Sequence, residues 1–390
     1  MNENEKIKRK FNIKRTLKLA FLVLFFILII VMISLYIAEE NFRKWTDENI
    51  FRKEISNEDA VTIDLDTNKK NQIYSYSRYL AIFNPKQISL YNINGDCETI
   101  IDVDINKALF DSAEKYLAIA EDGGKNFCLI FDKTYLWTGS EEGEILQICV
   151  NKNGYVAVVT TDNTYKSIVN VYNSSGKLLF RRYFASTRVV DLSISKDNKY
   201  ITIGEIDISG ALIQSNIKII SIEKAQNTED EEIIYNYEAR EGELLTKVNY
   251  HTNGKISCMY SDQIDIIEEQ ECKEVLSIKD NNATFLSNNL NTDMVYLEEV
   301  TDGLFSKKSV IHIVNSSDLQ DSIYELDELA KELQAKGDVI AVNVGTDIYF
   351  FSNKGWLIKK YSSNQEITNL TFSGSMAGII YRDRVEIISL

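Results

Sequence analysis

A short hairpin that recurs along the chain decides the fold, and residues 110–122, FDSAEKYLAIAED, show its form. A polar turn separates two apolar runs, and an aspartate, here Asp122, closes the second run. The other strong copies are VNKNGYVAVVTTD (150–162), ISKDNKYITIGEID (194–207), YHTNGKISCMYSD (250–262) and FSGSMAGIIYRD (372–383). Apolar runs on either side of such turns are typical of antiparallel hairpins, so the chain is predicted to be all-β over most of its length.

Each hairpin belongs to a longer unit. First strands are expected near residues 72, 108, 145, 189, 244, 283, 329 and 367, a mean spacing of about 42 residues. In three units the third strand ends in aromatic-[Asn/Ser]-x-x-Gly, at 91–95, 172–176 and 351–355, where glycine suits a turn with positive φ. A period of this length with four strands per unit predicts the blades of a β-propeller.

The two ends of the chain predict how the ring closes. The last unit stops at Leu390 without a fourth strand, whereas an unpaired strand, AVTIDLD (60–66), precedes the first unit. That strand can complete the last blade and remove its exposed edge. We therefore expect eight blades. Seven blades are the alternative, because SIYELDELAKELQAK (322–336) has Leu326, Leu329, Ala330 and Leu333 at helical spacing, and a helix there could replace one strand.

The N-terminal region contains one apolar run, Leu19 to Ala38, of twenty residues without charge, proline or glycine. As a helix it would be about 30 Å long, the thickness of a bilayer's hydrocarbon core. An uncleaved signal-anchor is the main interpretation, since a cleaved signal usually has a shorter core and a small-residue cleavage site. A cleaved signal and a buried soluble helix are the alternatives.

Charge predicts the orientation of this span. The residues up to Ala38 carry a net charge of +5 and the remainder −20. Basic flanks stay in the cytoplasm. We therefore expect a basic cytoplasmic tail (1–18), a transmembrane helix (19–38) in the lipid bilayer, a juxtamembrane stalk (39–59) and an extracytoplasmic propeller (60–390). The stalk is expected to be helical, with an irregular linker as the alternative. The basic residues before the span are Lys6, Lys8, Arg9, Lys10, Lys14, Arg15 and Lys18.

Composition excludes several classes of function. A net charge of −15 and a pI near 4.8 argue against a nucleic-acid partner, which requires a basic face. With 44% hydrophobic and 26% charged residues the chain is globular rather than disordered. No Walker loop, Rossmann glycine pattern, nucleophile elbow or EF-hand occurs. We therefore expect no cofactor and no metal.

Histidine and cysteine, the residues that most often carry chemistry, are assigned structural roles. His251 and His312 are isolated, without the Cys or acidic spacing of a zinc site. Cys128, Cys149 and Cys258 lie in apolar strands, where cysteine behaves as a small hydrophobe. With Cys97 and Cys272 the chain has five cysteines, an odd number, and none of them is in C-x-x-C spacing. A disulfide is therefore possible, but the sequence does not require one.

A recurrent acidic position is the one candidate binding feature. In six of the eight units an aspartate closes the second strand, and those residues are Asp122, Asp162, Asp207, Asp262, Asp347 and Asp383. One interpretation is turn capping, because Asp bonds to its own backbone in turns. The other is an acidic rim that attracts a cationic partner, since second-to-third turns share one face of a propeller. If the rim is structural, the central channel or the insertion near 223–243 becomes the place of recognition.

The repeat resembles the WD40-like and quinoprotein-like propellers, although no Gly-His…Trp-Asp pair recurs and only three Trp are present. The whole layout of basic tail, single span, stalk and acidic propeller resembles a family of clostridial membrane proteins, the domain of unknown function numbered 5711. That resemblance implies a bacterial cell-membrane protein and no activity.

Three classes of function follow as hypotheses. The first is a non-catalytic binding or scaffold module for an envelope protein, peptide or wall polymer. The second is a glycosidase or lyase that uses carboxylates and Tyr in the propeller cavity, because paired carboxylates need only be close in space. The third is an accessory or sensor subunit of a membrane complex. The fold alone does not choose among them.

Overall fold

The computed structural model describes residues 13–51, 53–56, 60–227, 233–238, 242–277, 282–302 and 306–390. Most of the expected basic tail lies outside these ranges. The chain divides between Glu54 and Ile55 into two compact units.

The N-terminal unit contains two helices, α1 (Ile13–Ala38) and α2 (Glu40–Asn49). Residues Leu17–Ala38 of α1 have a mean hydropathy of 3.1 and none of them is buried, so this helix is long and apolar enough to cross a membrane. The hydroxyl of Tyr36 donates to Oδ1 of Asp47 at 2.7 Å, and Nζ of Lys53 lies 2.8 Å from the same oxygen. These contacts tie the end of α1 to α2.

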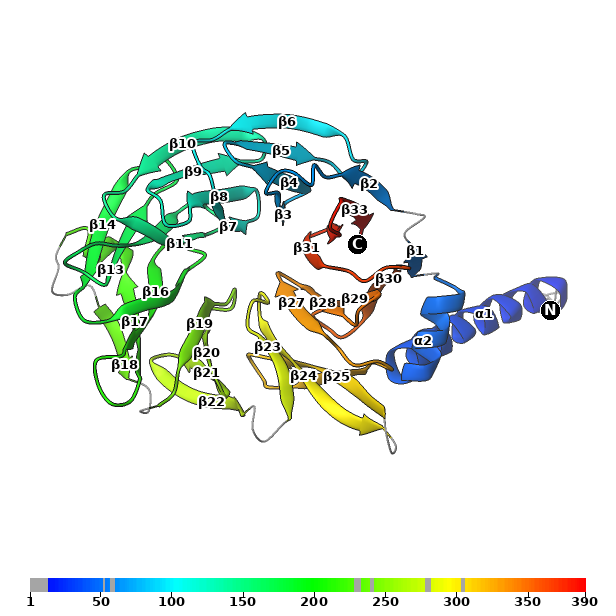
Figure 1. Ribbon diagram of the computed structural model, residues 1–390. Coiled ribbons are helices and arrows are strands. Elements are labelled where there is room, and N and C mark those ends of the chain that lie inside the picture. Colours follow the sequence, from blue (N-terminus) through cyan, green and yellow to red (C-terminus); the bar gives the residue numbers. More distant parts are fainter. Residues whose placement is uncertain are drawn as a thin grey trace, which may run out of the picture. The chain divides into compact units, whose positions relative to one another are not determined.

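The remainder of the described chain forms eight sheets, one for each repeat, arranged as the blades of a β-propeller (Figure 1). In the first six blades the four strands pair antiparallel in sequence order, whereas the seventh and eighth blades each take one further strand, β1 or β2, from before the first blade; the first strand of each repeat lies at the centre. The first strands are β3 (Gln72–Tyr76), β7 (Ala108–Ala113), β11 (Glu144–Val150), β15 (Arg188–Ile194), β19 (Leu245–Tyr250), β23 (Ala283–Ser287), β27 (Glu332–Lys336) and β31 (Asn369–Ser373). They begin within three residues of the predicted positions.

The outer strands follow the same order in every blade. The second strands are β4 (Tyr79–Asn84), β8 (Tyr116–Glu121), β12 (Val156–Thr161), β16 (Tyr200–Asp207), β20 (Ile256–Tyr260), β24 (Asp293–Asp302), β28 (Val339–Asn343) and β32 (Met376–Ile380). The third strands are β5 (Gln87–Tyr91), β9 (Asn126–Phe131), β13 (Ser167–Tyr172), β17 (Gln214–Ser221), β21 (Gln263–Glu268), β25 (Ser306–Asn315), β29 (Asp347–Ser352) and β33 (Arg384–Ser389). The fourth strands are β6 (Cys97–Asp102), β10 (Thr134–Ser140), β14 (Leu178–Phe184), β18 (Ile233–Glu238), β22 (Glu271–Ser277), β26 (Asp321–Glu325), β30 (Leu357–Ser362) and, in the last blade, β2 (Val61–Asp64).

The predicted closure of the ring is confirmed. Strand β2 pairs antiparallel with β33, with Val61 opposite Ile387 and Asp64 opposite Arg384. Val61 and Ile63 also pack on a buried cluster that includes Leu80 of the first blade and Val385 of the last. The N-terminal strand therefore completes the eighth blade and joins it to the first.

The prediction of a helix over residues 322–336 is wrong, and the seven-blade alternative that depended on it is wrong too. The segment forms the end of β26, a connection and β27. Tyr324 pairs with Ile311 on the neighbouring strand, and Leu326 and Ala330 are buried between the sixth and seventh blades. Leu329 is 41% exposed, so the four apolar residues do not form one buried face as a helix would require. Strand pairing determines the structure of this segment despite the helical spacing.

The stalk region is only partly helical. Helix α2 covers its first half, whereas β1 (Glu54–Ser56) joins the outer edge of β30 as a fifth strand of the seventh blade. The sequence did not predict β1. The next three residues lie outside the described ranges, and β2 follows them in the eighth blade.

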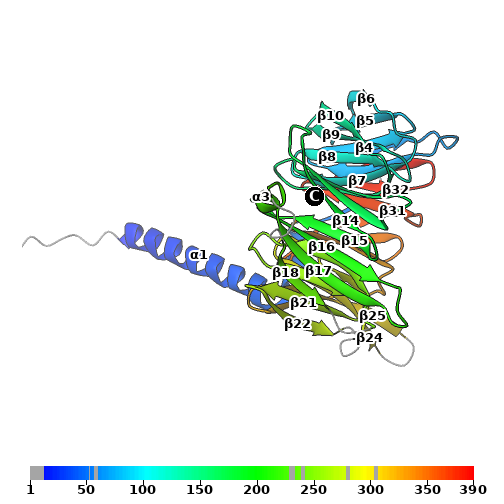
Figure 2. The same cartoon turned by 90° about the vertical axis from the view of Figure 1, so that its left-hand side faces the viewer.

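The core lies between neighbouring blades rather than within any one of them. The middle strands are buried on both faces, as in β13, where all six residues are buried, and therefore read as nearly continuous apolar runs. Figure 2 shows strands β16, β17 and β18 of the fourth blade side by side, with the short helix α3 (Ile222–Ala225) at one end of β17. Each blade is thus stabilised by the blades beside it.

Turns alternate between two faces of the propeller because all the strands within a blade are antiparallel. Turns from first to second and from third to fourth strands share one face, which we call the cavity face. The N–H of Leu390 donates to the carbonyl of Ser375 in the β31–β32 turn, so the chain ends on the cavity face. Turns from second to third strands lie on the other, the aspartate face. The expected glycine turns on the cavity face are confirmed, with φ of 79° at Gly95 and Gly176 and 75° at Gly355.

Candidate functional site

The main cavity of the described chain occupies the centre of the propeller, with a volume of about 1160 Å³. All eight blades contribute to its wall, through their first strands and the turns or segments that follow them on the cavity face. An adjoining cavity of about 320 Å³ shares five of its lining residues, Tyr74, Lys247, Asn289, Ala335 and Lys336. The two volumes therefore form one channel along the inner strands.

Hydrogen bonds between inner strands of neighbouring blades hold the wall of this cavity. The side chain of Gln72 both donates to the carbonyl and accepts from the N–H of Ala108. The carboxylate of Asp111 accepts from the N–H of Val150 at 2.7 Å. Such bonds fix buried polar groups on several strands, so the cavity is preformed rather than dependent on a ligand. Further bonds of this kind join Gln147 to Asp191, Asp191 to Val248, Asn249 to Asn288, Gln334 to Leu370 and Ser75 to Thr371.

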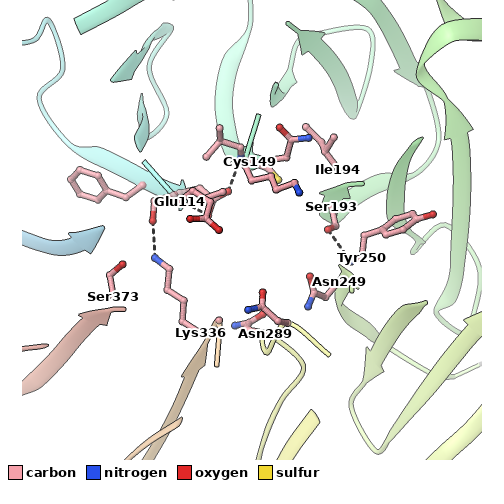
Figure 3. Close-up of a pocket in the computed structure, with 18 of the residues that line it drawn as sticks. Glu114, Cys149, Ser193, Ile194, Asn249, Tyr250, Asn289, Lys336 and Ser373 are labelled. Carbon is pink, nitrogen blue, oxygen red and sulfur yellow. Dashed lines mark hydrogen bonds between the residues drawn. The ribbon is translucent and has the colours of Figure 1, made fainter. Parts of the chain in front are cut away.

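Lys336 links the seventh blade to the first and second blades at the cavity wall. It ends β27 in the seventh blade, yet its ammonium donates to the hydroxyls of Tyr74 at 2.9 Å and Ser112 at 2.7 Å, in the first and second blades. It also lies 4.5 Å from the centroid of the Tyr74 ring. Figure 3 shows its side chain pointing into the open centre, with Asn289 and Ser373 beside it. A cation therefore lies in the cavity, held against its wall by neutral partners.

Burial shifts the pKa values of several ionisable groups that line the same cavity as Lys336. Burial raises the pKa of Asp191, although the N–H of Val248 and the amide of Gln147 oppose that shift. Burial, followed by the nearby charge of Lys152, lowers the pKa of Lys196. Burial also holds the pKa of the Cys149 thiol well above its ordinary value, which makes this thiol a poor nucleophile.

Four of the six predicted aspartates lie in second-to-third turns, and Asp207 ends the second strand β16, all on the face opposite the turns that line the cavity. Asp347 does not close a second strand as predicted, because β28 ends at Asn343 and Asp347 begins the third strand β29 at the same face. Asp162 accepts the N–H groups of Thr164 and Tyr165, and Asp207 accepts that of Ser209, so both cap their own turns. Three others lie beside a basic residue: Asp122 with Lys107, Asp347 with Lys360 and Asp383 with Arg384. Asp262 follows β20 in the same kind of turn. Local contacts thus account for most of these carboxylates.

The two histidines lie apart from the cavity's polar centre. His251 is 1% exposed and bonds through its ring nitrogens to the carbonyl of Leu290 and to Oγ of Ser257, between the fifth and sixth blades. Burial lowers its pKa. His312 lies on β25 with one nitrogen 2.7 Å from Asp321 and the other 3.1 Å from Glu298. Burial alone would lower the pKa of His312, but these carboxylates outweigh it and raise the pKa.

All five cysteines are free in the structure. Cys128, Cys149 and Cys258 lie in strands β9, β11 and β20, as expected, and Cys97 is exposed. Burial raises the pKa of Cys258 and Cys128. Among the described residues, no group of three or more His, Cys, Asp and Glu side chains has the arrangement to hold a metal ion.

Sequence reasoning named the channel as a place of recognition but missed its residues. The lysines of three turns, Lys115, Lys152 and Lys196, fall between the two strands of three hairpin copies, and the structure brings them to one cavity. Aligning the repeats would have shown this recurrence. Lys247 and Lys336 carry no such signal, because each lies inside a strand whose inward face the sequence alone does not reveal.

Eight four-stranded blades around a polar central cavity define this chain as an eight-bladed β-propeller with one apolar N-terminal helix. It belongs to the Family of unknown function (DUF5711), whose family model matches residues 51–390. The resemblance inferred from the layout of the sequence is thus confirmed. No curated relative matches the sequence.

Solved structures share the fold at low sequence identity. BamB from Moraxella catarrhalis is 13% identical with a TM-score of 0.51, over 84% of this chain and 98% of that chain. Sqt1 from Chaetomium thermophilum, bound to the N-terminus of the ribosomal protein L10, is 12% identical with a TM-score of 0.55, over 87% and 100% of the two chains. At these identities the likeness concerns the fold alone.

Proposed function

We propose that this protein is a membrane-anchored, extracytoplasmic β-propeller that acts as a non-catalytic binding or scaffold module at the bacterial cell envelope. Its partner, an envelope protein, peptide or wall polymer, binds at the central cavity. The observation that carries this proposal is that cavity, which all eight blades line with polar and apolar residues and whose wall is held by hydrogen bonds between blades. A preformed concave site with convergent polar groups is the usual place of recognition.

The anchor and its orientation form part of the proposal. The apolar helix α1 is long enough to span a bilayer, and the basic residues before it favour a cytoplasmic N-terminus. Protease added to intact, wall-stripped cells should then digest the chain beyond about residue 60. If that region is protected from the protease, the proposed orientation is wrong, but the proposed binding role is not tested by this result.

The solved relatives support recognition by a propeller of this shape. Sqt1 is bound to the N-terminus of another protein, so this architecture is able to hold a segment of polypeptide. In the present chain the carboxylates Asp111 and Asp191 accept backbone N–H groups of neighbouring strands, a role in holding the wall. That role supports a binding module over an enzyme that uses these acids.

Crosslinking of the whole protein in its native membrane, followed by purification, tests the proposal. We expect one or a few envelope components to be recovered repeatedly, and their recovery to fall when Lys336, which lines the cavity, is replaced by Met. The purified protein should release no products from wall glycans. Glycan turnover that depends on the cavity's carboxylates would replace the binding role with catalysis.

A further inference from the structure

We propose that the central cavity binds an acidic peptide segment, whose carboxylates pair with a group of five lysines that we call the cavity lysines: Lys115, Lys152, Lys196, Lys247 and Lys336. All five line the cavity. This inference rests on the proposed binding function and specifies the chemistry of the partner.

The cavity is positively charged in a protein that is otherwise acidic. Its wall carries Arg78 and the cavity lysines, against four acids, Asp111, Glu114, Asp191 and Asp338. The chain after Ala38 has a net charge of −20. A concave wall of opposite sign to its surroundings focuses the electrostatic field on the cavity and attracts anions.

Three of the four acids already have partners within the propeller. Asp111 accepts the N–H groups of Val150 and Ser112, at 2.7 and 2.8 Å. Asp191 accepts the N–H of Val248 at 2.9 Å and the amide of Gln147 at 2.6 Å. Asp338 accepts the amide of Asn291 at 3.1 Å. These carboxylates therefore hold the wall. Asp191 still interacts electrostatically with Lys247, and Asp338 with Lys196, but neither forms an ion pair with a cavity lysine.

The cavity lysines differ from many other lysines of the propeller in lacking a carboxylate partner. Within the described residues, no Asp or Glu oxygen lies within 4.0 Å of the ammonium group of any of them. On the outer parts of the blades, Lys133 lies 2.9 Å from Glu98 and Lys331 lies 3.0 Å from Glu366. An anion bound in the cavity would supply the missing partner.

Mutual repulsion within the group supports the same conclusion. Burial and then the charge of Lys152 lower the pKa of Lys196, whereas the charges of Glu114 and Asp338 oppose this shift without reversing it, so repulsion between the two ammonium groups persists. Lys336, in turn, bonds to neutral oxygens of Tyr74 and Ser112. A carboxylate placed among them would remove the repulsion and favour the charged form of each lysine.

The other lining residues favour a peptide over a phosphate polymer. The side chains of Asn289 and Ser373 face the open centre and have no hydrogen bond to the described residues, and an amide such as Asn289 matches the donor and acceptor of a peptide group (Figure 3). Leu146, 41% exposed, offers an apolar contact in the same wall.

Direct binding measurements on the whole protein in detergent test this inference. The probes are a fluorescent peptide of alternating Glu and Leu, the same peptide with Lys in place of Glu, and poly(glycerol phosphate). The cavity variant is Lys152→Gln, Lys196→Gln and Lys247→Gln together. The matched control is Lys125→Gln, Lys177→Gln and Lys354→Gln, which removes the same charge from exposed residues outside the cavity.

We expect the Glu-Leu peptide to bind, its affinity to fall with salt, and the cavity variant to bind about tenfold more weakly, while the control is unchanged. Equal weakening in both variants would overturn the inference, because net charge alone would then explain the binding. Binding of poly(glycerol phosphate) alone, with the same dependence on the cavity, would replace the peptide by a wall polymer. If the cavity variant recovers the same partner from membranes as the parent chain does, the cavity lysines do not bind that partner and this inference is overturned. The proposed function as a binding module would still stand.

Discussion

Both faces of the propeller carry charged side chains, but those charges are paired differently on the two faces. On the aspartate face, the carboxylates of Asp162 and Asp207 cap their own turns, and Asp347 lies 3.0 Å from Lys360. On the cavity face, Lys152 and Lys196 line a cavity, and among the described residues no Asp or Glu oxygen lies within 4.0 Å of either ammonium group. A charge that is satisfied locally stabilises a turn, whereas one that is held without a partner in a concave wall is available to a ligand. Recognition is therefore expected at the cavity.

Opening the ring should have the largest effect, because both faces depend on a closed propeller. Deleting residues 60–66 removes β2 from β33 and exposes the edge of the last blade. The loss of the half-buried Val61 and Ile63 alone costs about 2 kcal/mol, so the deleted chain should melt several degrees lower or aggregate. Thermal unfolding followed by circular dichroism measures this. Unchanged melting would mean that β2 contributes nothing to closure.

Removing the Lys336 cation should have the next largest effect and should separate binding from stability. Lys336→Met keeps the length of the side chain but loses the bonds to Tyr74 and Ser112. We expect partner or acidic-peptide binding to weaken about tenfold and the free energy of unfolding to fall by only about 1 kcal/mol. Lys354→Met, at an exposed turn, is the matched control. Loss of stability without loss of binding would mean that Lys336 contributes to the stability of the fold and not to binding.

Neutralising the aspartate face should change binding little. Replacing Asp122, Asp162, Asp262 and Asp383 by Asn preserves most turn bonds, because the Asn side chain accepts the same N–H groups. The exposed ion pairs that are lost, such as that of Asp383 with Arg384, are each worth less than about 1 kcal/mol. Binding assays on this variant and the parent chain should agree. A large loss of binding would move recognition to the aspartate face.

A pH-dependent residue inside a blade should affect stability alone. Because Asp321 and Glu298 raise the pKa of His312 above its unfolded value near 6.5, charged His312 stabilises the fold below about pH 6.5, and this contribution is lost as pH rises through the raised pKa. The stability difference between the parent chain and His312→Gln should thus be larger at pH 6 than at pH 8.5. Urea unfolding at the two values measures it, and a difference that grows with pH would contradict this assignment.

The sequence predicted the fold well because each blade repeats a local pattern. The hairpin at 110–122 contains its own turn and both apolar runs, and the strand at 60–66 is visible as an unpaired run. The stretch 322–336 misled because four apolar residues fell at helical spacing, while their pairing partners, such as Ile311 for Tyr324, lay on another strand. Strand β1 has only three residues, too few for a period to show.

The candidate site was harder to predict because its residues are scattered. Each blade contributes between two and seven residues to the cavity, and the contributions of neighbouring blades lie tens of residues apart along the chain, so Lys196 and Lys336 share a site that no linear motif links. The aspartates, in contrast, repeat at one position of the unit and were easily seen, yet Asp162 and Asp207 serve their own turns. The residue that recurs most clearly in the sequence is therefore one that stabilises turns, and its recurrence does not identify the binding site.

Site-specific photocrosslinking on the two faces tests the central claim most directly. A benzoylphenylalanine placed at Asn289 reports on the cavity, and one placed at Ile208, which is 51% exposed after Asp207, reports on the aspartate face. In native membranes we predict a discrete crosslinked partner from Asn289 that acidic peptide displaces, and none from Ile208. A partner captured from Ile208 and not from Asn289 would contradict the account.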